Sequence, residues 1–335
     1  MSYRGPIREK GIPNVFNVFD LDNTKKKARQ DEWQEQTQSV FASVEVGWKS
    51  MLYLTLTGRN DWASQLANSS TPCFFYPSVG LSGVISEMLT LPEFIDYMKV
   101  RGSFSSVGMP YPRNLTSPTY EYDEANQQWK PKTHYPIKDL KPERTNSWEL
   151  GLDMRLFKDF SLGFSWYLAN TFNQTFDPKV SVSSGYSKIY LQTGYVRNSG
   201  VELSLGYGHT WNNHLHWESN FTLSHNKNTI KDLVTSYIHP ETGLPITQNR
   251  LDVGGLGKAR FILKKGGTLG DLYTQSDLKR DNNGMVEIDP SGALTTEDNL
   301  PDIKLGSVFP KANLAWNNRF EWRGISLSAL FTARI

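Results

Sequence analysis

Apolar and polar residues alternate with a period of two along residues 143–171, whose sequence is ERTNSWELGLDMRLFKDFSLGFSWYLANT. Trp148, Leu150 and Leu152 begin one apolar series, and the residues between its members are charged or glycine. Because side chains on a strand alternate between two faces, the pattern predicts a hairpin with one apolar and one polar face. Each arm exceeds the usual strand of about five or six residues and matches the roughly 9 to 11 that a tilted strand needs to cross a bilayer.

The same alternation predicts about ten long strands. We place them near residues 40–49, 51–62, 74–85, 98–108, 145–156, 160–172, 195–208, 214–226, 309–320 and 324–335. Short turns are expected at Lys49-Ser50, Lys158-Asp159, Asn212-Asn213 and 321–323, with a longer one at 87–97; long connections fall at 63–73, 109–144, 173–194 and 227–308. Short turns on one rim and long loops on the other are typical of a bacterial outer-membrane barrel.

The long connection 227–308 is too long for a featureless loop, and we expect it to fold on itself, with short strands in 260–275 and 284–292. Trp48, Trp211 and Trp322 stand at or beside short turns, where an aromatic girdle would lie. Residues 1–38 are expected to be irregular, as part of an extracellular loop.

Composition narrows the class of protein. The 335 residues are 13% aromatic, and no stretch approaches 18 consecutive apolar residues, which excludes a helical membrane protein. Lys and Arg number 36 against 34 Asp and Glu, and the longest basic run is Lys25 to Lys27. The sequence therefore lacks the excess of clustered basic residues that indicates a nucleic-acid-binding protein. The single cysteine, Cys73, excludes an internal disulfide, and the N-terminal MSYRGPIREKG does not resemble a signal peptide.

Charged residues on the predicted polar face are the first candidate site. They would be costly in lipid but acceptable around a water-filled lumen, where they could hold something inside the barrel. The alternative is that they form ordinary ion pairs in the wall. The candidates are Arg59, Asp61, Arg101, Glu149, Asp153 and Glu202.

Aromatic residues in the long loops are the second candidate site. Exposed rings can stack on sugars or pack on a protein partner, and they can equally hold the loops together. These candidates are Tyr120, Tyr122, Trp129, Tyr186 and Tyr190.

Catalytic and metal signals are weak. The sequence has no nucleophile elbow, no phosphate-cradling glycine loop and no zinc-spaced Cys/His set, so we expect no enzyme and no cofactor. A calcium loop is one interpretation of the oxygen ligands spaced along 281–289, although the same segment is consistent with a simple turn. Its candidate ligands are Asp281, Asn283, Glu287 and Asp289.

Five collinear segments carry a family resemblance: FFYPSVGLSGVISE (74–87), VRGSFSSVGM (100–109), ERTNSWELGLDMRLFKDFSLGFSWY (143–167), TGYVRNSGVELSLGY (193–207) and KLGSVFPKANLAWNNRFEWRGISLSALFTARI (304–335). They resemble successive strands of the SusC/RagA-type TonB-dependent transporters of the Bacteroidetes outer membrane. GRNDW (58–62) is also similar to that family's Arg-x-Asp strand end, although Trp62 and Ala63 replace the usual Gly-Ser.

The resemblance implies that residues 39–335 are part of an antiparallel transmembrane β-barrel of about 22 strands. It further implies an N-terminal plug with a TonB box, both absent from this sequence, a TonB complex that energises import, and a SusD-like lipoprotein lid that captures oligosaccharides or peptides. We therefore expect a fragment of an outer-membrane nutrient importer.

Two other classes of protein are alternatives. A secreted soluble all-β binding module would bury its apolar faces against a second sheet and would dissolve without detergent. A barrel enzyme would need Ser, His and Asp converging in the lumen or at its rim, and no spacing supports that.

Overall fold

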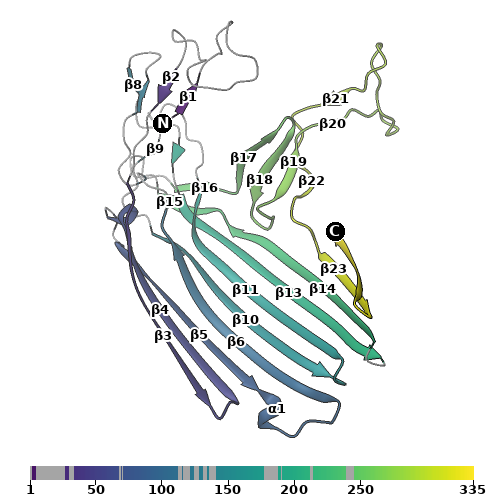
Figure 1. Ribbon diagram of the computed structural model, residues 1–335. Coiled ribbons are helices and arrows are strands. Elements are labelled where there is room, and N and C mark those ends of the chain that lie inside the picture. The colour runs from purple at the N-terminus through teal and green to yellow at the C-terminus, as the bar shows by residue number, and fades with distance from the viewer. Residues whose placement is uncertain are drawn as a thin grey trace, which may run out of the picture. The chain divides into compact units, whose positions relative to one another are not determined.

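The computed structural model (Figure 1) describes residues 2–4, 27–29, 34–67, 69, 71–111, 115, 121–123, 128–130, 134–135, 141–176, 188–189, 191–211, 214–238 and 245–335. The chain divides into two compact units, Met1–Thr37 and Gln38–Ile335. In the first unit, β1 (Ser2–Arg4) pairs antiparallel with β2 (Lys27–Arg29). Most of the segment that was expected to be irregular lies outside the described residues.

A ten-stranded antiparallel sheet forms the framework of the second unit (Figure 1). Its strands are β3 (Thr37–Trp48), β4 (Leu52–Ala63), β5 (Cys73–Val84), β6 (Ile95–Met109), β10 (Glu143–Leu156), β11 (Phe160–Phe176), β13 (Leu191–Trp211), β14 (Leu215–Asp232), β23 (Asn313–Trp322) and β24 (Ile325–Arg334). Each strand is hydrogen-bonded to its neighbours in this order, so β3 and β24 are the two edges. The structure confirms the all-β antiparallel prediction and contains all ten predicted strands.

Positive φ angles close the tight turns of this meander. Lys49 and Ser50 have φ angles of 50° and 57°, and Phe157 and Lys158 have 52° and 66°. Two central residues with positive φ are typical of the hairpin turn whose twist matches that of the flanking strands. The expected turns at Lys49-Ser50 and near Lys158 are therefore present.

The last turn differs from the expectation. β23 begins at Asn313 rather than at 309 and continues through Trp322, so the turn lies at Arg323 and Gly324. Gly324 has a φ of 85°, which glycine adopts at no steric cost and which places the reversal after Trp322. The 87–97 connection also differs, because it starts within a short helix, α1 (Ile85–Met88).

The pairing register separates an apolar face from a polar face. Leu152 of β10 lies opposite Phe164 of β11 and Val100 of β6, and Phe164 in turn lies opposite Leu203 of β13. Asp153 lies opposite Gly163 and Lys99. We call these two sides of the sheet the apolar face and the polar face.

The apolar face is broad and uncovered by any described part of the chain. Trp148 and Leu150 are 53% and 56% exposed, and Leu327 on β24 is 69% exposed. From Trp148 to Leu156 the apolar series extends about 27 Å along the strand, or roughly 21 Å across a bilayer at a tilt of about 40°. This approaches the apolar band of about 25 Å that outer-membrane barrels present to lipid.

Buried apolar residues instead gather in two small clusters at the long-loop end of the sheet. The first holds Leu66 of the 3₁₀ helix η2 (Ser64–Leu66) together with Ala63, Phe74, Tyr111 and Leu115. The second holds Val196, Ile230, Leu233, Leu251 and Leu263. The second cluster joins the sheet to the segment that follows β14, since Leu251 and Leu263 belong to that segment.

The segment 227–308 folds on itself. Its strands are β15 (Val234–Ile238), β16 (Pro245–Gln248), β17 (Arg250–Leu256), β18 (Ala259–Lys264), β19 (Asp271–Thr274), β20 (Asp277–Leu278), β21 (Thr296–Glu297) and β22 (Ile303–Ser307). β17, β18, β19 and β22 form a four-stranded sheet, so the strands expected in 260–275 are present. The prediction of a strand in 284–292 is wrong. Only isolated bridges occur there, because tight turns at Gly284 and Gly292 prevent a continuous strand.

Short ladders lie in the other long loops. β7 (Glu121–Asp123) pairs with β8 (Gln128–Lys130), and β9 (His134–Tyr135) pairs in parallel with β12 (Lys188–Ile189). Within the described residues, no helix has the length and apolar character needed to span a membrane.

Candidate functional site on the polar face

Arg101 of β6 is the hub of the polar face. Its Nη1 donates to Oδ2 of Asp153 at 2.8 Å, and its Nη2 donates to the Ser165 hydroxyl at 2.7 Å. A longer ion pair of 3.3 Å joins Nη2 to Oε1 of Glu149. One guanidinium therefore links β6, β10 and β11 and lies between two carboxylates that stand four residues apart on the same strand.

Gly151 makes this arrangement possible. It lies on β10 between Glu149 and Asp153, directly opposite Arg101 in the register. A Cβ atom on Gly151 would lie 2.5 Å from Cζ of Arg101, far inside van der Waals contact. The guanidinium therefore lies against the bare backbone of Gly151, and any side chain there would displace it.

A second ion pair lies farther along the sheet. Nε of Arg59 is 2.7 Å from Oδ1 of Asp61, and its Nη2 donates to the Ser39 hydroxyl at 2.9 Å. Asp61 is only 6% exposed, and a buried carboxylate needs an opposite charge beside it. The guanidinium of Arg59 supplies that charge. This pair links β4 to the edge strand β3.

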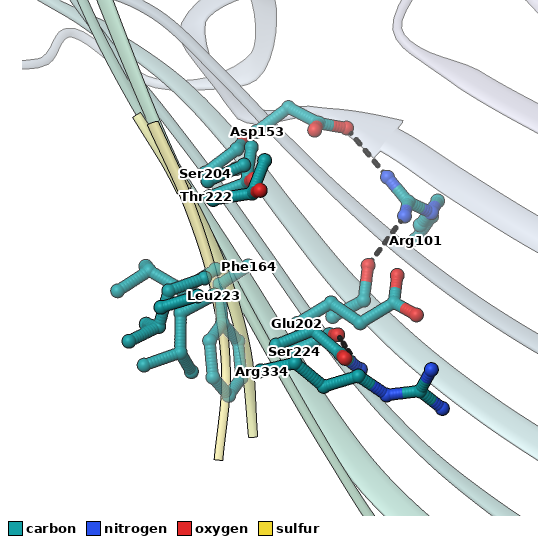
Figure 2. Close-up of a pocket in the computed structure, with 17 residues that line it drawn as sticks. Arg101, Asp153, Phe164, Glu202, Ser204, Thr222, Leu223, Ser224 and Arg334 are labelled. Atoms are coloured by element: carbon teal, nitrogen blue, oxygen red, sulfur yellow. Dashed lines mark hydrogen bonds and ion pairs between the residues drawn. The ribbon is translucent and has the colours of Figure 1, made fainter. Parts of the chain in front are cut away.

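A hollow of about 680 Å³ lies beside the Arg101 network. Figure 2 shows Glu202 and Arg334 extending to the same side of the sheet as Arg101, while Phe164 and Leu223 lie on the other side. The side chains of Glu202 and Arg334 make no hydrogen bond or ion pair with any described residue. The hydroxyl and amide side chains that also line the hollow are Ser165, Ser204, Thr222, Ser224, Asn313 and Thr332.

The hollow thus offers a carboxylate, a guanidinium and several neutral hydrogen-bonding groups to a polar solute. It contains no nucleophile activated by a base among the described residues. Its chemistry is that of reversible binding.

The structure brings together some of the predicted charged residues and separates others. Arg101, Glu149 and Asp153 form one network, Arg59 and Asp61 form another, and Glu202 lines the hollow. All six stand on the polar face, as the alternation predicts. Of the predicted aromatic residues, Tyr122 stands on β7 and Trp129 on β8, whereas Tyr120, Tyr186 and Tyr190 lie outside the described residues.

The calcium candidates are spread over separate turns. Asp281 accepts hydrogen bonds from the backbone N–H groups of Asn283 and Met285, and Asp289 accepts from Ser291. Glu287 is paired with Lys279 at 2.7 Å. No three Asp, Glu, His or Cys residues form a metal-binding group within the part of the chain that the structure describes. Local hydrogen bonding of the turns accounts for these residues.

Some members of the polar-face site were not among the sequence candidates. Ser165, Gly151 and Arg334 are small or lie near the end of an edge strand, and nothing in their residue type marks them. Only the position of Gly151 could have indicated its role, because it stands between two carboxylates on the polar face of β10, opposite Arg101.

Comparison with known proteins identifies the family. The model of the family described as "TonB dependent receptor-like, beta-barrel" matches residues 2–284. The chain belongs to this family. A TonB-dependent receptor β-barrel lies in the outer membrane and is not an enzyme, so the membrane location is assigned, and both the soluble module and the barrel enzyme are set aside.

Two curated TonB-dependent receptors of Formosa agariphila are similar in sequence. The chain is 24% identical to receptor P39 over 296 residues, which cover 85% of this chain and 25% of the relative. It is 26% identical to receptor P26 over 226 residues, which cover 65% of this chain and 23% of the relative. The chain therefore spans about a quarter of the length of the curated receptors it matches.

Solved structures agree on the fold. The RagAB peptide transporter matches with a TM-score of 0.69 and 18% identity, over 95% of this chain and 35% of that one. The RagAB peptide importer in its "open-open" state matches with a TM-score of 0.68 and 18% identity, over 96% of this chain and 34% of that one. The ten-stranded sheet is thus the fold of part of a TonB-dependent receptor barrel.

Proposed function

We propose that this chain forms part of the wall of a TonB-dependent importer that takes up nutrients across the outer membrane. In this proposal the apolar face contacts lipid and the polar face lines the lumen. The carrying observation is the separation of charge between the two faces, because the ion pairs of Arg59 and Arg101 stand on one face and the exposed leucines and tryptophans on the other. Lipid tolerates the second set and excludes the first.

The substrate class is oligosaccharide or peptide, captured with a SusD-like surface lipoprotein as the lid. The similarity to the RagAB peptide transporter supports this type of importer, and the hollow between Arg101 and Arg334 supports a polar solute rather than an apolar one. Energy would come from the TonB complex, as in other members of the family.

The folded segment 227–308 is proposed to lie on the extracellular side. It begins in the last residues of β14 at the long-loop end, and buried carboxylates hold it together. Asp302 forms ion pairs with Arg250 at 2.7 Å and with Lys264 at 2.8 Å, and Asp271 forms one with Lys304 at 2.7 Å. Such a segment is rigid enough to present a defined surface to the lid.

Uptake by cells that express the protein from its own gene tests this proposal. We expect deletion of the gene to abolish uptake of either labelled oligosaccharides or labelled peptides, and a protonophore to abolish it in the parent strain. Within the protein, Glu202→Gln and Arg334→Gln should reduce uptake while the amount in the outer membrane stays constant. Arg155→Gln, on the polar face but outside the hollow, is the matched control.

Uptake of both substrate classes that survives deletion would refute the importer proposal. Equal uptake by all three variants would show that the hollow does not bind the substrate. The importer proposal itself would stand.

A further inference from the structure

At the paired strand positions of the apolar face, Lys and Arg occur at one end only. From the short turns up to the β-bulge at Tyr195, none of these positions in β4 to β24 holds Asp or Glu. Cations do occur there, all at the long-loop end: Arg144 on β10, Arg197 on β13 and Lys227 on β14. We call these residues the rim cations.

Neutral atoms position the rim cations without neutralising them. Nε of Arg197 donates to Oδ1 of Asn170 at 2.8 Å, and its Nη2 donates to the Tyr195 hydroxyl at 2.6 Å. Nη2 of Arg144 donates to the backbone carbonyl of Phe75 at 3.0 Å. The side chain of the exposed Lys227 has no hydrogen bond or ion pair with a described residue. Past the bulge, Asp232 is already paired with Lys265 at 2.7 Å.

The rim cations lie where lipid headgroups would meet the barrel wall. Toward the short turns, the next residue on the same face of β10 after Asn146 is Trp148, which packs on Phe104 with ring centroids 4.7 Å apart. Phe172, opposite Arg144, stacks on Tyr195 at 4.8 Å. Aromatic rings followed by outward cations are typical of the boundary between the apolar core and the headgroups.

Spacing allows the rim cations to act on one patch of headgroups. With about 4.8 Å between strands and about 6.8 Å between alternate residues, the Cα atoms of Lys227 and Arg197 are roughly 8 Å apart, and those of Arg197 and Arg144 roughly 12 Å. Long side chains reach across such gaps.

At the opposite end of the apolar face, the paired strand positions hold no Lys or Arg, and His209 is 2.8 Å from Asp159. The cations there, Lys49 and Arg323, stand in the short turns beyond the strands, each over the ring of its neighbouring tryptophan.

We propose that Arg144, Arg197 and Lys227 bind the phosphate of anionic lipids in the membrane leaflet on the long-loop side. The excess of positive charge favours an anionic ligand. Because the rim cations continue the rows of residues proposed to face lipid, the anion is expected to belong to a lipid. The preset fork of Arg197 suits phosphate oxygens, because guanidinium groups bind them in a fixed planar geometry. This inference rests on the proposed wall of the importer.

Lipid binding to the full-length protein, purified in detergent, tests the inference. Native mass spectrometry would give apparent dissociation constants for phosphatidic acid and for zwitterionic phosphatidylcholine. We expect tighter binding of phosphatidic acid, and we expect Lys227→Gln to weaken it about fivefold, since a cation near an anionic surface contributes roughly that factor. Lys99→Gln, which removes a cation from the polar face of β6, should leave it unchanged.

Further variants keep the test independent of folding. Arg197→Lys should retain most of the preference, whereas Arg197→Gln should reduce it like Lys227→Gln. Phosphatidylcholine binding should be the same in all variants. Equal dissociation constants for Lys227→Gln and Lys99→Gln would overturn the inference, as would displacement of phosphatidic acid by inorganic phosphate, because the site would then recognise any phosphate. Absence of both lipids from the unaltered protein would instead refute the membrane wall itself.

Discussion

Leu152→Arg should destabilise the barrel because Leu152 lies halfway along the apolar series of β10. It is flanked by Phe164 and Val100, so an Arg placed there has only apolar neighbours. Trp148 and Leu156 bound the series about 13 Å away along the strand on each side, which puts Leu152 roughly 10 Å from either interface at a tilt of about 40°. An Arg at the midplane costs about 2 to 4 kcal/mol.

The same substitution near the rim supplies the matched control. Leu168 lies opposite Trp148 at the end of the apolar series, and Leu168→Arg can extend its guanidinium to the headgroups. Its cost should be about 0 to 1 kcal/mol. Asp153→Asn, next to Leu152 but on the polar face, keeps an oxygen for Arg101 and should cost less than about 1 kcal/mol.

Equilibrium unfolding of the full-length protein in vesicles measures these costs. Denaturant titration, followed by tryptophan fluorescence, should order the variants as Leu152→Arg, then Leu168→Arg, then Asp153→Asn, from most to least destabilised. Thicker bilayers should widen the gap between the two Arg variants. Equal destabilisation by both, in bilayers of either thickness, would refute the claim that the apolar face meets lipid.

Other predictions address the polar face and the loops. Gly151→Ala should displace Arg101 and lower stability by about 1 to 3 kcal/mol, whereas Gly208→Ala, with no atom within 4 Å of the added Cβ, should change it by less than about 0.5 kcal/mol in the same titration. The hydrogen bond from Arg250 holds the pKa of Asp302 far below its usual value of about 3.9. The ionised Asp302 carboxylate therefore stabilises the folded segment fully above about pH 3.9, and this stabilisation is lost as the pH falls through the lower pKa of the folded state. Amide exchange in β17 and β18, corrected for its intrinsic pH dependence, should therefore rise only below about pH 4 in the parent protein. Trp129→Ala should weaken binding of substrate or lid without impairing assembly; loss of the assembled barrel would show that this ring is structural.

Alternation alone predicts most of the sheet, since the apolar and polar positions of β10 and β11 follow a strict period of two. The loops were harder, because their structure depends on contacts that no local pattern contains. Asp302 and Arg250 are 52 residues apart, and only the folded segment brings them together. Strand ends also escaped prediction: the turn at Gly324 depends on a backbone conformation, whereas Trp322 fits either a turn or a strand.

The candidate site divides in the same way. The faces of Arg101, Glu149 and Asp153 follow from parity, but their joining depends on the register between β6 and β10. The rim cations could have been found by parity as well, since Arg144 and Arg197 share a face with the apolar series of their strands and follow it beyond Asn146 and Ser199.

Accessibility of two adjacent cysteines tests the central claim most directly. Leu203 and Ser204 of β13 stand on opposite faces, opposite Phe164 and Gly163 of β11. In the protein expressed from its own gene, with Cys73 replaced by Ala, Ser204→Cys should react with a small charged maleimide and Leu203→Cys should not. Leu203→Cys should react instead with a maleimide that partitions into lipid. Equal reaction of both cysteines with the charged reagent would contradict a membrane wall with a polar lumen.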